Sequence, residues 1–99
     1  MMAKIIIKRR FLEGKTAEVL ELMHDLRFAA MSQDGYVTGE TLMQVDDPQK
    51  LVVIGTWQNI DSWHKWQNTD MRTELEAKLE AYTVEPTIYE EYVVGPKVY

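Results

Sequence analysis

Cysteine is absent from this 99-residue chain, and acidic side chains outnumber basic ones. Without a thiol the chain forms no disulfide, no thiolate nucleophile and no cysteine–metal site. The formal net charge of −5 disfavours nucleic acids and anionic membrane surfaces, because proteins that bind either usually carry a basic excess. Hydrophobic runs are short too: three consecutive isoleucines near the N-terminus are too few for a signal peptide or a membrane span. We therefore expect a cytoplasmic protein with no nucleic-acid or membrane partner.

The composition is otherwise that of a globular protein. Hydrophobic residues make up 45% of the chain and charged residues 27%, which argues against disorder. A chain of this length holds one core, so we predict a single domain over residues 1–99. Because that core is limited, pairing with a second copy would add useful apolar burial.

Hydrophobic periodicity predicts an α+β fold with the order β-α-β-β-α-β. Strands are expected over residues 3–11, 36–45, 51–57 and 87–94, with Gly95-Pro96 ending the last one. Helices are expected over residues 16–31, with Thr16 as N-cap, and from Asn59 or Asp61 onward, with a break and a second cap at residues 68–70. This order fits a ferredoxin-like split βαβ unit with an antiparallel sheet, in which the last strand lies beside the first.

The first predicted strand divides its side chains between two faces, with one exception. Apolar side chains take one face and basic ones the other: Ala3, Ile5, Ile7 and Phe11 against Lys4, Lys8 and Arg10. Arg9 breaks the pattern because it falls on the apolar face. Glu90 and Glu91 of the last strand would lie beside the basic face, where opposite charges across strands contribute up to about 1 kcal/mol each.

The two helical regions each show an apolar stripe. The first stripe comprises Val19, Met23, Leu26 and Ala30, and the second comprises Met71, Leu75, Leu79 and Tyr82. The acidic residues of the second region are expected on its solvated face: Glu74, Glu76, Glu80 and Glu85.

Trp57, Trp63 and Trp66 form a dense aromatic group for so short a chain. Together with Tyr36 they could wall a flat pocket between helix and sheet that receives a planar ligand. Core packing explains them equally well, because aromatic side chains bury large areas.

Three titratable residues are candidates for chemistry. Arg9 could hold an anionic group or an enolate, turn to solvent at a strand bulge, or pair internally with Glu40. Glu40 lies mid-strand, where it could act as a general base or sit exposed or ion-paired. His64 could transfer a proton, although simple solvation explains it more directly. The two histidines, His24 and His64, lack metal-ligand spacing, so we predict no metal site.

The middle of the chain carries a recognisable series of motifs. Asp34-Gly35-Tyr36-Val37-Thr38-Gly39-Glu40 leads into a strand, Asp46-Asp47-Pro48 follows, and Gly55-Thr56-Trp57 precedes a helix that holds Trp66, nine residues after Trp57. This series resembles the antibiotic biosynthesis monooxygenase (ABM) family, and with the flanking elements the resemblance covers nearly the whole chain. It implies ferredoxin-like protomers that pair their sheets into a dimeric α+β barrel. Known activities of the family include cofactor-free oxidation of aromatic polyketides, haem degradation and, in relatives, quorum-signal processing.

The resemblance to the haem-degrading branch is incomplete. Trp66 matches that branch, but its axial histidine, ten residues further on, is replaced here by Glu76. Its first-strand asparagine falls where this chain has Ile7 or Lys8. A carboxylate is a poor substitute for imidazole at haem iron.

Three functions therefore compete. The first is a cofactor-independent monooxygenase that acts with O2 on a small planar aromatic or quinol-like molecule, whose anion Arg9 would stabilise in a dry, tryptophan-lined site. The second is a non-catalytic homodimeric protein that binds a small aromatic molecule in the same cavity. The third is a haem-binding or haem-degrading variant. Fold alone does not choose among them.

Overall fold

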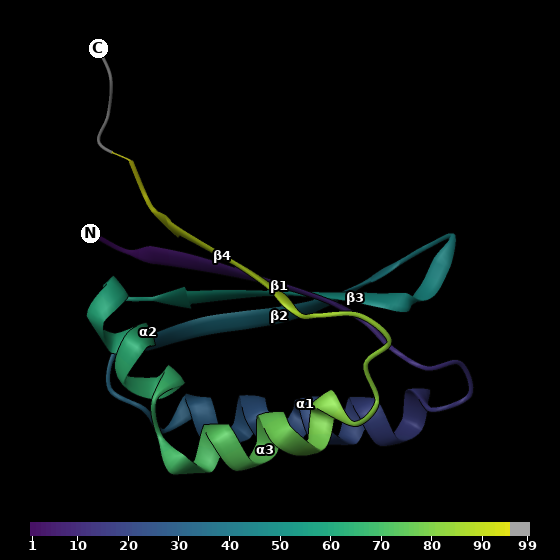
Figure 1. Ribbon diagram of the computed structural model, residues 1–99. Coiled ribbons are helices and arrows are strands. Elements are labelled where there is room, and N and C mark those ends of the chain that lie inside the picture. Colours follow the sequence, from purple (N-terminus) through teal and green to yellow (C-terminus); the bar gives the residue numbers. More distant parts are fainter. Residues whose placement is uncertain (96–99) are drawn as a thin grey trace.

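Four antiparallel strands form one sheet in the order β2-β3-β1-β4, and the helices lie across one of its faces (Figure 1). The computed structural model describes residues 1–95 of the chain. The elements are β1 (Ala3–Arg10), α1 (Thr16–Met31), β2 (Tyr36–Gln44), β3 (Asp47–Trp57), α2 (Ile60–Gln67), α3 (Asp70–Glu80) and β4 (Ile88–Val93). The predicted ferredoxin-like α+β fold is confirmed, with β4 beside β1 and the second helical region divided in two. The predicted end of the last strand at Gly95-Pro96 lies partly outside the described residues.

The hairpin between β2 and β3 is tighter than the sequence predicts. Gln44 pairs with Asp47, which leaves a two-residue turn, so β3 begins four residues before the expected Leu51. The sequence favoured a loop at Pro48. The pairing of β3 with β1 ends at Lys50, so Pro48 lies outside this pairing and its missing N–H is tolerated. Arg10 hydrogen-bonds the Asp47 carboxylate there, which lowers the pKa of Asp47 below its usual range.

Helix boundaries follow the predicted caps in α2 and α3 but not in α1. The Asn59 side chain accepts a hydrogen bond from the Ser62 backbone N–H at 2.8 Å. Thr69 Oγ1 accepts one from the Arg72 backbone N–H at 3.3 Å, so the second cap is confirmed. Thr16 is instead the first helical residue of α1, and the N-cap position, Lys15, makes no side-chain cap bond. The prediction that Thr16 caps α1 is therefore wrong.

The turn before β2 depends on Gly35, as the Asp-Gly sequence indicated. Gly35 has a φ of +85°, which other residues adopt only with strain. A Cβ added at Gly35 would also lie 2.3 Å from Ser62 Oγ. The turn thus holds the start of β2 against the start of α2.

Between the sheet and the helices lie two clusters of buried side chains. One cluster comprises Ala3, Ile5, Ile7, Ala30, Trp57, Trp63 and Trp66. The other comprises Phe11, Val19, Met23, Leu51 and Leu79. The predicted stripe of α1 is confirmed, with Val19, Met23 and Ala30 buried. The stripe of α3 is partly wrong: Met71 is 55% exposed, whereas Arg72 is buried.

The opposite face of the sheet is left uncovered by helices (Figure 1). Strand register places on it the partly exposed apolar side chains Ile6, Leu42, Val52, Ile54, Ile88 and Tyr92. Lys8 pairs with Glu90 on this face, N to O 3.3 Å, as predicted. Glu91 does not join them, because it lies opposite Ile5 on the helix side of the sheet. None of the described helices is long and apolar enough to cross a membrane.

Candidate functional site

A cavity of about 70 Å³ lies between the helix side of the sheet and the helices. Its lining combines apolar side chains with an aromatic group and a few charged groups: Ile5, Ile7, Arg9, Met23, Leu26, Arg27, Ala30, Tyr36, Gly39, Val53, Gly55, Trp57, Trp63, Trp66, Arg72 and Glu76. A concave apolar space with a few convergent polar groups is the usual form of a small-molecule site.

Two glycines leave the floor of this cavity without side chains. Gly39 of β2 and Gly55 of β3 pair across the sheet, and both line the cavity. A Cβ at Gly39 would lie 3.0 Å from the Tyr36 hydroxyl and 3.2 Å from Arg27 Nε. The absent side chains therefore make the room that the aromatic and basic groups of the pocket occupy.

Aromatic rings form the wall at the α2 end of the pocket. Tyr36 meets Trp57 edge-on, with ring centroids 5.3 Å apart and an interplanar angle of 86°. Trp63 continues the group at 6.1 Å from Trp57. Trp66 is 4% exposed and lines the same space. These residues both pack the core and wall the pocket, so the two interpretations of the tryptophans describe one arrangement.

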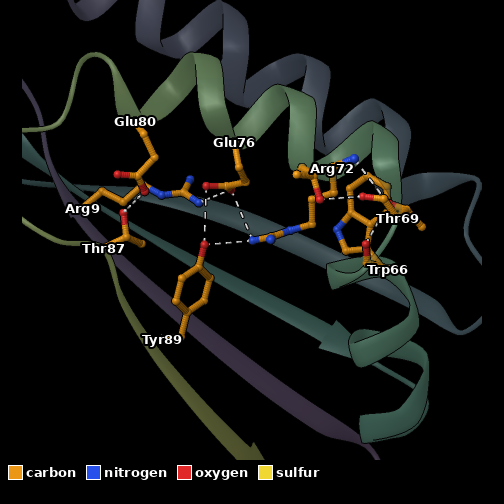
Figure 2. A network of polar contacts seen from close by, with 9 residues as sticks. Arg9, Trp66, Thr69, Arg72, Glu76, Glu80, Thr87 and Tyr89 are labelled. Atoms are coloured by element: carbon orange, nitrogen blue, oxygen red, sulfur yellow. Dashed lines mark hydrogen bonds and ion pairs between the residues drawn. The ribbon is translucent and has the colours of Figure 1, made fainter.

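The other end of the pocket is polar, and Figure 2 shows how its side chains meet. Arg9 of β1 points toward the helices and forms an ion pair with Glu76 of α3. Arg72, one turn earlier on α3, donates to the same Glu76 oxygen, Oε1, at 3.2 Å. Tyr89 of β4 receives a hydrogen bond from Arg72 at 3.1 Å and contacts Glu76 Oε2 at 3.4 Å. One carboxylate thus holds two guanidinium groups beneath the helix layer.

Both arginines of this cluster are buried. Their side chains are 3% and 7% exposed, for Arg9 and Arg72 respectively. Arg72 also lies over the ring of Trp63, at 5.1 Å from its centroid, and near that of Tyr89, at 5.5 Å. Such cation–π contacts help to hold a desolvated guanidinium in place.

The structure brings most of the predicted site residues together. Arg9 faces the pocket, as strand alternation indicated; it neither turns to solvent nor pairs with Glu40. Glu40 is exposed on the opposite face of the sheet, where it lies beside Ile54. His64 lies outside the lining and bonds Glu91 Oε2 at 2.9 Å, near the surface. The geometry therefore gives neither Glu40 nor His64 access to the cavity.

Arg72 and Glu76 were missed by the sequence analysis, which assigned Glu76 to a solvated helix face. Its side chain is only 12% exposed. A signal was present: Arg72, Leu75, Glu76 and Leu79 have the i, i+3, i+4, i+7 spacing of one helix face. The predicted stripe began at Met71 instead. A helix with Met71 facing the sheet would have Glu76 pointing away from it.

The amino-acid sequence shows which family this chain belongs to. The family model described as "Antibiotic biosynthesis monooxygenase" matches residues 2–78, well over half of the chain. This chain belongs to that family. The resemblance seen in the motifs around Gly35, Trp57 and Trp66 is thereby confirmed. Comparison with curated proteins found no match.

Solved structures of ABM-type and related proteins have the same fold. A conserved protein from Methanosarcina mazei Go1 superposes with a TM-score of 0.87 at 16% identity, covering 93% of this chain and 91% of its own. SnoaB, a cofactor-independent oxygenase from Streptomyces nogalater, gives 0.83 at 15% identity, covering 99% and 98%. Rv0793 from Mycobacterium tuberculosis gives 0.86 at 9% identity, covering all of both chains. At these identities the likeness shows the fold alone.

Haem, which the resemblance raised, does not fit the residues of this ABM-family pocket. Glu76, at the position of the axial histidine in the haem-degrading branch, is already bound by Arg9 and Arg72. No histidine lines the pocket within residues 1–95. In the same part of the chain no three histidine, aspartate or glutamate side chains gather as a metal site.

Proposed function

We propose that this ABM-family protein is a monooxygenase that oxidises a small planar hydroxylated aromatic, such as a quinol, with O2 and without a flavin or metal. The observation that carries the proposal is the buried Arg9 guanidinium at the end of a tryptophan-walled cavity. The structural similarity to SnoaB, a cofactor-independent oxygenase, is consistent with it.

Arg9 would act on the electron-rich form of the substrate. A phenolate or enolate reacts with O2 far more readily than its neutral parent, and a fixed guanidinium in a dry site favours the anion. For a quinol the reaction balances when one oxygen atom of O2 enters the ring as a new hydroxyl group. The other oxygen leaves as water and the ring is oxidised to a hydroxyquinone. The tryptophans would hold the ring flat and exclude water.

Oxygen consumption tests this proposal. With hydroquinone, the wild-type protein should consume O2 well above the rate in buffer, and ¹⁸O2 should label the hydroxyquinone. Arg9→Gln should lower that rate by about tenfold or more, because a charged donor to the developing oxyanion is lost. Glu74→Gln, on the exposed side of α3, is the matched control and should keep the wild-type rate. Consumption equal to that in buffer would leave a non-catalytic binding protein as the function.

We further propose that two copies pair through the uncovered face of the sheet. The partly exposed apolar side chains on that face include Ile6, Val52 and Ile54 at its centre. Burying them against a second sheet would enlarge a core that is small for a free-standing chain. The pocket lies on the other side of the sheet and would stay accessible.

A further inference from the structure

The polar end of the pocket carries more positive than negative charge. Glu76 uses the single oxygen Oε1 to meet both Arg9 and Arg72. Within residues 1–95 no second carboxylate pairs with either arginine. Buried charges are stable only when compensated, so two guanidinium groups sharing one carboxylate favour a further anion.

One donor of this cluster also lacks a partner. Arg9 Nε is buried and bonds no acceptor among the described residues. An unmet buried donor is costly, and in a pocket it marks a position where a ligand oxygen gains a hydrogen bond without displacing another. Arg9 lines the cavity, so a ligand that moves the side chains packed around this arginine would place an oxygen at its Nε.

The volume of the pocket restricts the ring that accompanies such an anion. A cavity of about 150 Å³ holds one benzene ring, and the space here is about 70 Å³. One ring therefore fits only if a lining side chain yields. Arg27 is half-buried, and its Nη2 is held by a bond to Thr41 Oγ1 at 2.8 Å. Of the lining side chains, half-buried Arg27 would move at less cost than the buried tryptophans, which favours a single ring over fused rings.

We propose that the pocket binds a monocyclic aromatic carboxylate, with its ring against the tryptophans and its carboxylate on the Nε edge of Arg9. This inference rests on the proposed function in one respect: it names the substrate class of the same pocket. A benzoate with a hydroxyl group next to its carboxylate would place both oxygens beside Arg9, and so combines this anion with the phenolate that the oxidation would attack.

Benzoate and benzamide provide the direct test, because they match in shape and differ in charge. Titrated against tryptophan fluorescence at neutral pH, benzoate should bind wild-type protein about tenfold or more tightly than benzamide. Arg9→Gln should remove that preference, and Glu74→Gln should keep it. Equal affinity of wild-type protein for the two molecules would overturn the proposal.

Glu76→Gln should have the opposite effect on benzoate binding to that of Arg9→Gln. Removing the internal carboxylate leaves both arginines uncompensated, so benzoate should bind this variant about tenfold more tightly than wild type. If the variant is less stable, benzoate should raise its melting temperature more than it raises that of wild type, and benzamide should not. Weaker benzoate binding in Glu76→Gln would contradict the proposal. It would show that the Glu76 carboxylate does not compete with the ligand for the positive charge of the two arginines.

The two proposals fail in different ways. Benzoate binding that depends on Arg9, without O2 consumption on any quinol or hydroxybenzoate, would support the ligand class and refute the monooxygenase. Oxidation of hydroquinone without a preference for benzoate over benzamide would do the reverse.

Discussion

Trp66 illustrates how one residue serves both packing and the pocket. Its side chain is 4% exposed and belongs to the cluster that joins α2 to the sheet. Trp66→Ala should therefore lower the free energy of unfolding by about 3–5 kcal/mol, because a large side chain is lost and a void remains. Urea denaturation followed by circular dichroism measures the loss. Phe28→Ala, at a 72% exposed position of α1, is the control and should change stability little. An unaltered midpoint in Trp66→Ala would mean that the ring does not pack as the structure shows.

Arg9 and Glu76 show that the face of a buried charge can be predicted from the sequence, whereas its partner cannot. Strand alternation alone placed Arg9 on the core side, and the structure confirms it. Its partner could not be found in the same way, because the two residues are far apart in the sequence and meet only when the helices fold over the sheet. A buried charge predicts that a counter-charge exists without naming it.

The break between α2 and α3 shows how local sequence positions an element. Thr69 Oγ1 caps α3 through the Arg72 backbone N–H, and this end of α3 also places the Arg72 side chain in the pocket. Thr69→Ala should lower the free energy of unfolding by about 1 kcal/mol, the usual cost of a lost N-cap. Thr69→Ser keeps the hydroxyl and should retain most of the stability. Equal losses in both variants, measured by chemical denaturation, would point to the Thr69 methyl group rather than to the cap.

At the scale of the whole molecule, the uncovered sheet face leads to a testable assembly. If two copies pair through it, the interface should bury on the order of 2,000 Å² in total, as in other obligate dimers. Sedimentation at micromolar concentration should then give about twice the 11.6 kDa of one chain. Ile54→Lys places a charge at the centre of the face and should shift the protein toward monomer. Glu40→Gln, on the same face, removes a charge and should leave the dimer intact. A wild-type monomer at that concentration would refute the pairing.

The sequence by itself determined the family, the order of the elements and the faces of most of them. These features depend on local periodicity, on caps such as Asn59 and Thr69, and on the turn at Gly35, all of which act within a few residues. The same periodicity placed Arg9 and the tryptophans on one side of the sheet. It misjudged the start of β3, where pairing with Gln44 outweighed the preference of Pro48 for a loop.

Only the tertiary structure decided which charged side chains meet. It removed Glu40 and His64 from the pocket and brought Arg72, Glu76 and Tyr89 to it from α3 and β4. The physical reason is that rotation of a helix by one residue changes which of its side chains face the sheet. The sequence of α3 would allow either the face of Met71 or the face of Arg72 to turn toward the sheet. Packing against the sheet and the ion pair between Glu76 and Arg9 select the face of Arg72.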